Sequence, residues 1–211
     1  MSLDDVYLTR AERATMARDV HPLFATRGPP GTHDLALLER TFEALSVAGP
    51  DDETPLTAFD KLADDRAPEP AWPCFRGRPR AILIDGWCLG ALPETPEALE
   101  QPLNRLERDR DPDGVWRKAV NAFVGGRHLA LAERLDARLF LRAPGFDAVL
   151  DWRCEQEEGL RGRALTTEER HAIADFIPYF ERLTRRMIDG SVRADVVVQL
   201  DRNRLPATIT P

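Results

Sequence analysis

Short apolar runs alternate with longer amphipathic segments along this chain. The runs at 80–84, 137–141 and 194–200 are typical of buried strands, and 56–60 is a shorter candidate. Residues 1–8 have the pattern of a strand end that delivers two adjacent acids. We therefore expect strands at these positions, with helices between them.

Helix start signals and helical periodicity fill the intervals. Thr9 to Glu12 form a capping box, and Asp34 precedes a stretch whose apolar residues share one helical face. The expected helices begin near Arg10 and at Asp34 and cover 99–123, with a break at 111–114, then 146–160 and 168–188.

This alternation predicts an α/β fold with a mainly parallel sheet flanked by helices. We expect residues 1–211 to form a single domain, with a lid helix around 146–165 and a long ordered loop over 61–78. In such sheets ligands bind at the carboxyl ends of the strands. Asp4, Asp5 and Asp85 all fall at such predicted ends.

The composition of the chain limits its classes of binding partner and its cellular compartment. A net charge of -7 and a pI near 5.2 argue against nucleic acid and anionic membranes. Neither a bilayer-spanning apolar run nor a secretory signal is visible. Three widely spaced cysteines fit neither a disulfide framework nor a zinc site, so we expect a cytoplasmic protein. His128 and His171 are interpreted as surface residues, with no His/Cys cluster of the metal-binding type.

The acids are the first candidates for chemistry. Transfer of a phosphoryl group to a hydroxyl needs a proton acceptor and carboxylates for Mg²⁺. Adjacent strand residues point to opposite faces, so Asp4 and Asp5 can act together only if the chain turns directly after Leu3. The plainer alternative is a pair of ordinary acids at a turn, and for Asp85 a turn-forming Asp-Gly.

Two basic regions are the next candidates. Residues 27–34 combine prolines and glycines with Arg27 and His33, and a rigid loop with a fixed cation suits a small anionic substrate. Arg153, Gln156 and Glu157 share one helical face, which could close over phosphates. The alternatives are a conformational connector and an exposed amphipathic helix.

A glycine-rich phosphate loop ending in Gly-Lys-Ser/Thr does not occur among these residues. The two lysines are Lys61 and Lys118, and neither follows a glycine. Acids suited to phosphoryl transfer are thus present without the loop that such a site depends on.

Taken in order, the motifs resemble the glycerate 3-kinase-type P-loop kinases, relatives of uridine kinase, phosphoribulokinase and bacterial pantothenate kinase. Each motif is weak alone, but the ordered set is specific and covers essentially the whole chain. The motifs are residues 2–9, 27–34, 59–61, 64–66 and 85–90, Trp116 with Asn121, 152–157, and 200–206.

The resemblance implies roles for individual residues. Asp4 matches the general base, Asp5 would assist with metal or substrate, and Asp85 matches the Walker B acid, where this family often has Glu. Asp5 and Asp85 are thereby implied as Mg²⁺ ligands. The implied substrate-binding residues are Arg27, Thr32, His33, Asp60, Lys61 and Arg66. The implied ATP-binding residues are Arg153, Gln156, Arg161, Asp201 and Arg204.

The function implied is ATP-dependent phosphoryl transfer to a small hydroxy acid, with D-glycerate as the favoured acceptor. Relatives begin with a central strand and the phosphate loop, which these residues lack. We therefore expect a chain truncated at a gene-prediction or cloning boundary, with possible self-association through the incomplete sheet. The alternative is a non-catalytic kinase-like binding protein that has lost ATP chemistry.

Overall fold

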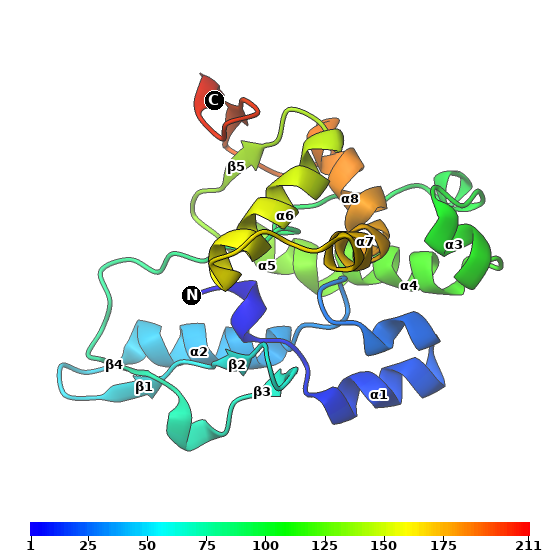
Figure 1. Cartoon of the computed structure of the whole chain (residues 1–211). Coiled ribbons are helices and arrows are strands. Elements are labelled where there is room, and N and C mark those ends of the chain that lie inside the picture. The colour runs from blue at the N-terminus through cyan, green and yellow to red at the C-terminus, as the bar shows by residue number, and fades with distance from the viewer.

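The computed structural model describes all of residues 1–211, and its mixture of helices and strands confirms the α/β class. The N-terminal third, coloured blue to cyan, occupies the lower part of the molecule in Figure 1, and the helices of the second half lie above it. None of the helices has the length and apolar character needed to cross a bilayer.

The helices follow the predicted order closely. Thr9 and Asp34 both cap the helices expected of them, by accepting hydrogen bonds from the backbone of Glu12 and Leu37. The expected helix 168–188 is two helices, because Pro178 starts a new one. The helices are α1 Arg10–Asp19, α2 Leu35–Val47, α3 Arg105–Arg110, α4 Val115–Phe123, α5 Leu129–Glu133, α6 Asp147–Arg161, α7 Thr167–Phe176 and α8 Pro178–Ile188. Shorter turns are η1 Leu3–Asp5, η2 Pro22–Ala25, η3 Glu69–Ala71, η4 Glu97–Leu99 and the π-helical η5 Val124–His128.

The strands form three small sheets instead of one parallel sheet. Only β5 and β6 pair in parallel, and the other pairs are antiparallel. The sheets are β1 Glu53–Pro55 with β4 Cys74–Arg76, β2 Phe59–Asp60 with β3 Asp65–Arg66, and β5 Leu139–Arg142 with β6 Val196–Leu200 and β7 Pro206–Thr210.

The prediction of a buried strand at 80–84 is wrong. This segment is irregular, and Leu83 is 84% exposed. Its run of apolar residues indicated burial, but a strand also needs partners for its backbone, and the backbone bonds here go only to the first residues of the chain. Leu83 O accepts from the N-terminal ammonium, and Asp85 pairs in parallel with Ser2. The strand expected at 137–141 begins at Leu139 and forms a half-exposed edge, since β5 pairs only with β6.

The N-terminal residues belong to the core. Leu3 and Val6 are completely buried, and they pack with Leu38, Cys88 and Leu131 in the largest apolar cluster. Because these residues are fixed by packing, the acids between them are held on a rigid support.

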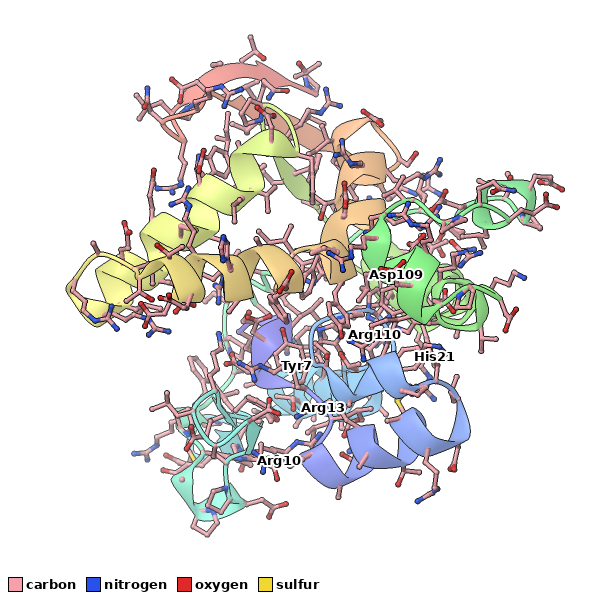
Figure 2. All side chains as sticks on the ribbon, turned by 45° about the vertical axis from the view of Figure 1, so that its right-hand side comes forward. Tyr7, Arg10, Arg13, His21, Asp109 and Arg110 are labelled. Atoms are coloured by element: carbon pink, nitrogen blue, oxygen red, sulfur yellow. The ribbon has the colours of Figure 1, made fainter.

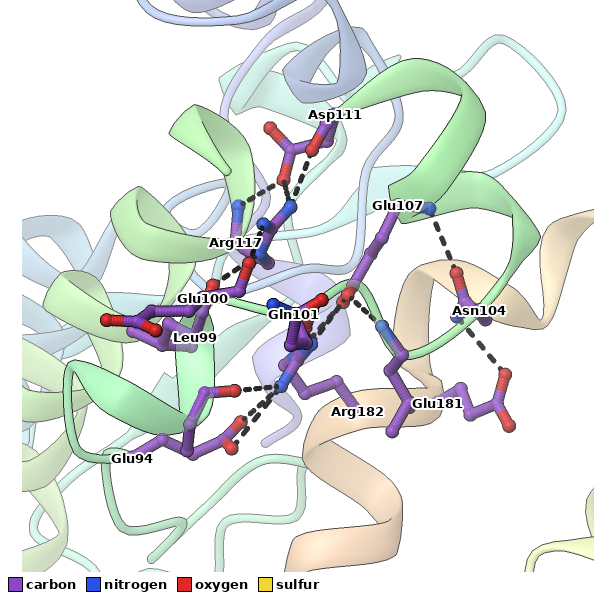
Figure 3. A network of polar contacts seen from close by, with 12 residues as sticks. Glu94, Leu99, Glu100, Gln101, Asn104, Glu107, Asp111, Arg117, Glu181 and Arg182 are labelled. Atoms are coloured by element: carbon purple, nitrogen blue, oxygen red, sulfur yellow. Dashed lines mark hydrogen bonds and ion pairs between the residues drawn. The ribbon is translucent and has the colours of Figure 1, made fainter. Parts of the chain in front are cut away.

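A buried polar network holds the 94–117 region against α8 (Figure 3). Arg182 donates to Glu107 at 2.8 and 2.7 Å and also contacts Glu94 and two backbone carbonyls. Arg117 pairs with Asp111 at 3.1 Å, and both side chains are almost fully buried. Asp111 also accepts from the backbone N–H groups of Trp116 and Arg117, which fixes the start of α4.

We predict that Asp111→Ala destabilises the fold by about 3–5 kcal/mol, because it leaves the Arg117 guanidinium buried without its partner. Asp109→Ala is the matched control. Its ion pair with Arg105 is exposed, so the expected change is within about 0.5 kcal/mol. Urea unfolding measures both, and equal effects of the two substitutions would contradict the prediction.

Candidate active site

The first five residues bring the predicted acids together. The chain turns at η1 directly after Ser2, which meets the condition under which Asp4 and Asp5 can both serve one site. Ser2 links the acids, since its hydroxyl accepts from Asp4 N at 3.2 Å and donates to Asp85 Oδ2 at 2.8 Å. Asp5 Oδ2 accepts from Ser2 N at 3.1 Å and completes a capping box.

Asp4 has two further partners. The Tyr7 hydroxyl donates to Asp4 Oδ1 at 2.6 Å, and Lys61 Nζ donates to Asp4 Oδ2 at 3.2 Å. Burial acts to raise the pKa of Asp4, but the bond from Tyr7 and the charge of Lys61 outweigh it and hold the pKa below its usual value. Asp4 is therefore an ionised carboxylate at neutral pH, which is the state that accepts a proton.

Asp60 is the last residue of β2, and Lys61 begins the turn between β2 and β3. Asp60 Oδ1 accepts from Leu62 N and Ala63 N, which shapes the turn and occupies that oxygen. The turn thus presents the Lys61 ammonium, which is more than half exposed, to Asp4.

The basic residues predicted for the substrate are already paired with acids. Arg27 forms an ion pair with Asp64 and lies 5.6 Å from the centre of the Phe59 ring. Arg66 donates to Asp34 Oδ2 at 3.1 Å and to Tyr7 O at 3.0 Å. Arg27 keeps 30% of its side chain exposed, whereas Arg66 keeps 17%, so Arg27 is the more accessible of the two.

Thr32 lies inside the loop of residues 27–34. It is buried, and its hydroxyl donates to Pro29 O at 2.7 Å and accepts from Gly28 N at 2.9 Å. Gly31 has a φ of 101°, and a Cβ there would lie 2.4 Å from the Phe123 ring, so the loop packs too closely for a side chain. The loop is rigid, as its composition predicts, through contacts within itself and with the core.

His33 is buried as well, and it lies beside two residues far away in the sequence. His128 and Cys88 are both buried, and each offers a donor atom within 4.8 Å of those of the other two residues. The interpretation of His128 as a surface residue is therefore wrong, and so is the expected absence of a His/Cys cluster. His171 is exposed, as expected.

The residues predicted for ATP lie on α6 and on the turn between β6 and β7. A cavity of about 670 Å³ is lined by Arg153, Gln156 and Arg204, together with Val149, Trp152 and Glu155. Arg204 lies 5.3 Å from the Trp152 ring and pairs with Glu155. A volume of this size is typical of small-molecule sites.

Two of the predicted ATP residues lie outside this lining. Arg161 is paired with Glu157 and with Glu169, the latter at 2.7 Å. Asp201 accepts from Asn203 N and Leu205 N at 2.8 Å and shapes the turn that carries Arg204. In this arrangement Asp201 positions the cavity wall.

The donor set at Asp5 and Asp85 fits Mg²⁺. Each carboxylate keeps one oxygen without a protein hydrogen bond, and Mg²⁺ binds through one or two carboxylates while retaining water. Asp4, Asp5 and Asp85 do not form a cluster of three ligand atoms within 4.8 Å. The lining of the cavity on α6 offers an aromatic ring, an amide and cations.

Sequence reasoning missed three residues that organise the site, namely Ser2, Tyr7 and Asp64. Ser2 stood in a capping box with Asp5, which could have revealed it. Tyr7 lies three residues from Asp4, but a hydrogen bond across η1 has no sequence signature. Asp64 has a φ of 54° and contacts α1 and residue 27, both distant in the sequence.

Comparison with known proteins places these features in context. No family model matches the chain. An uncharacterized kinase, mug58, of Schizosaccharomyces pombe is 27% identical to this chain over an alignment of 227 residues. The alignment covers 99% of this chain and 78% of that protein. The chloroplastic D-glycerate 3-kinase of Arabidopsis thaliana is 30% identical over 187 residues, covering 84% of this chain. This chain is thus related to the glycerate 3-kinase-type kinases. It spans 38% of the length of the Arabidopsis enzyme.

Solved structures share the fold of this chain. D-glycerate 3-kinase from Cryptococcus neoformans superposes with a TM-score of 0.77 at 20% identity, covering 100% of this chain and 78% of that one. The YGR205w protein gives a TM-score of 0.68 at 22% identity, covering 100% and 76%. The small sheets and helices described above therefore follow the arrangement of this kinase fold.

We predict that Tyr7→Phe raises the pKa of Asp4, because burial remains while the hydrogen bond is lost. The lowered pKa of Asp4 stabilises the fold above the carboxyl's unfolded value of about 3.9, and this contribution disappears as the pH falls through the folded value. Tyr7→Phe should thus destabilise the protein at pH 7 by about 1–3 kcal/mol, and less at pH 3.

Carboxyl-carbon NMR titration and urea unfolding at the two pH values measure these effects. Tyr179→Phe is the control, since the other tyrosine of the chain contacts Arg110 and not Asp4. An unchanged pKa of Asp4 in Tyr7→Phe would exclude the proposed role of the hydroxyl.

Proposed function

We propose that the protein transfers a phosphoryl group from ATP to a hydroxyl of a small hydroxy acid, with D-glycerate as the acceptor. The observation that carries the proposal is the ionised Asp4, paired with Lys61, in a chain related to kinases over nearly its whole length. D-glycerate is proposed because it is named for the relative from Arabidopsis and for the structural neighbour from Cryptococcus.

Asp4 is the proposed general base. It is ionised, and its backbone N–H donates to the Ser2 hydroxyl, which in turn donates to Asp85, so the proposed base and a candidate metal ligand belong to one hydrogen-bonded segment. Such an arrangement suits phosphoryl transfer, in which the protein mainly positions the reactants and stabilises charge. Mg²⁺, when held by Asp5 and Asp85, would neutralise phosphate charge.

Lys61 and Arg27 are the proposed contacts for the substrate carboxylate. Both are partly exposed, and both face acids that a bound anion could compete with. Thr32 and His33 keep a proposed place in the substrate region as buried supports of its loop, and Asp60 and Arg66 as residues that shape it.

The cavity on α6 is the proposed site of the adenosine part of ATP. Trp152 supplies a flat apolar face, while Arg153, Gln156 and Arg204 supply polar contacts at its wall. We propose α6 as a lid that closes during the reaction, with Arg161 at its far end. We also propose that the protein is cytoplasmic, that it forms a single domain and that it self-associates through its incomplete sheet.

In the whole protein as the organism makes it, Asp4→Asn should lower turnover by about 10²–10⁴-fold while ATP affinity changes little, because a general base acts on the reacting hydroxyl. Asp51→Asn, an exposed acid paired with Arg76, is the control and should leave turnover unchanged. A coupled assay of ADP release with D-glycerate measures both. Turnover of Asp4→Asn within a few-fold of the natural protein would shift the role of base to Asp5, and absence of ADP release from the natural protein would favour the non-catalytic alternative.

A polypeptide limited to these 211 residues should bind Mg-ATP weakly and show no turnover. The amides of a phosphate loop and the helix that follows it supply most of the grip on the β- and γ-phosphates, and neither lysine here follows a glycine. Calorimetry with Mg-ATP and the ADP assay decide this point. Micromolar binding with turnover would show that the phosphates are held by other groups in this chain.

A further inference from the structure

Two histidines and a cysteine meet in the interior from three separate segments. His33 belongs to the loop before α2, Cys88 to the turn after Asp85, and His128 to η5. Their exposed fractions are 6%, 1% and 3%, and their donor atoms lie within 4.8 Å of one another. This is the one such cluster of metal-ligating side chains in the chain.

The hydrogen bonds of the two rings define their protonation. His128 Nδ1 lies 3.2 Å from Phe123 O, and because a carbonyl only accepts, His128 carries its proton on Nδ1. His128 Nε2 is then a free lone pair, so His33 Nδ1 must donate to it across 3.4 Å. This leaves His33 Nε2 as a buried lone pair, and no donor contacts it.

An unpartnered polar atom in the core is unusual and calls for an explanation. The two rings make one long N–H···N contact, and the cluster contains a thiol that makes no side-chain hydrogen bond. A cation between His33 Nδ1, His128 Nε2 and the thiol would replace the long contact and engage the thiol, while the lone pair on His33 Nε2 would receive the proton of the ring.

We propose that His33 Nδ1, His128 Nε2 and the Cys88 sulfur bind a transition-metal cation, with Zn²⁺ as the ion that fits best. Imidazole and thiolate are the ligands that zinc prefers, whereas Mg²⁺ and Ca²⁺ prefer oxygen. The proposed site is distinct from the carboxylates assigned to Mg²⁺.

The spacing of the nitrogens agrees with this assignment. Zinc–nitrogen bonds of about 2.0–2.1 Å at a tetrahedral angle place two nitrogens about 3.3 Å apart. The nitrogens of His33 and His128 are 3.4 Å apart. Zinc–sulfur bonds of about 2.3 Å require the sulfur to lie about 3.6 Å from each nitrogen, so separations within 4.8 Å have to shorten by about 1.2 Å at most.

The proton balance of binding is definite. The Cys88 thiol loses its proton to solvent, and the proton of His33 moves from Nδ1 to Nε2, so one proton is released for each ion bound. His33 Nε2 then becomes a donor. The Asp4 carboxylate does not accept from this nitrogen, because its two oxygens accept from Tyr7 and Lys61.

The backbone supports the same conclusion. η5 is a π-helical turn, and Gly126 within it has a non-helical φ of -95° and ψ of -117°. Such turns often occur at functional sites. The turn ends at His128, whose side chain enters the interior. Tyr7 stacks on the His33 ring at 4.9 Å and donates to Asp4. An ion that holds His33 in place would therefore also hold Tyr7, and through it the candidate base.

The experiment is a zinc titration of the whole protein after treatment with a chelator. We expect one equivalent to bind, the melting temperature to rise, and one proton to be released, which calorimetry in buffers of different ionisation enthalpy measures. Co²⁺ in place of zinc should give a sulfur-to-metal charge-transfer band, a readout that needs no variant.

Cys88→Ser and His128→Gln should each weaken binding by at least about 100-fold. The matched controls are Cys154→Ser, a buried free cysteine outside the cluster, and His171→Gln, an exposed histidine, and both should bind as the natural protein does. The absence of a stoichiometric zinc site and of the Co²⁺ band in the natural protein would overturn the proposal, as would unchanged binding in Cys88→Ser. In that case the rings form a neutral histidine pair that only fills the core.

Discussion

The buried guanidinium of Arg13 is the constraint on which the N-terminal half depends. Only 1% of Arg13 is exposed, and it is the buried residue of α1, with Tyr7 nearby (Figure 2). It donates to Leu8 O, Ala25 O, Asp64 O and Asp64 Oδ2 at 3.3 Å or less. A buried cation needs such complete pairing, since an unpaired one is very costly. Arg13 therefore fixes three separate segments to α1 at once.

This constraint extends to the candidate site through a single turn. The Asp64 carboxylate forms ion pairs with Arg13 through one oxygen and with Arg27 through the other. Asp64 has a left-handed backbone conformation at the end of the turn 61–64. Lys61 begins the same turn and donates to Asp4. Because the turn is anchored at Asp64, the position of the Lys61 ammonium follows from a buried arginine that itself contacts no acid of the site. We infer that Arg13 positions Lys61, whose charge helps to hold the pKa of Asp4 below its usual value.

Local sequence signals predicted local structure well, whereas contacts between residues distant in the sequence were not predicted. The caps at Thr9 and Asp34 were readable because each bond spans three residues. The acids at the chain start were proposed from the pattern of a strand end and from the resemblance to kinases, although residues 3–5 form the turn η1 and not a strand. The prediction of a strand at 80–84 was wrong because a strand depends on neighbouring strands that its own residues do not specify. The interpretation of His128 as a surface residue was wrong for the same reason, since its partners are 40 and 95 positions away in the sequence.

The rigidity of the acids comes from the segment that follows them. Residues 6–8 exchange backbone bonds with the loop before α2, through Leu8 N to Thr32 O at 2.8 Å and Asp34 N to Val6 O at 2.7 Å. Arg66 holds Tyr7 O, and the Tyr7 ring lies on His33. Proton transfer is sensitive to displacements of about 1 Å, so a base gains from a support that cannot shift. Asp4 thus depends on two buried groups that do not touch it: the arginine that anchors the turn of Lys61, and the histidine on which Tyr7 rests.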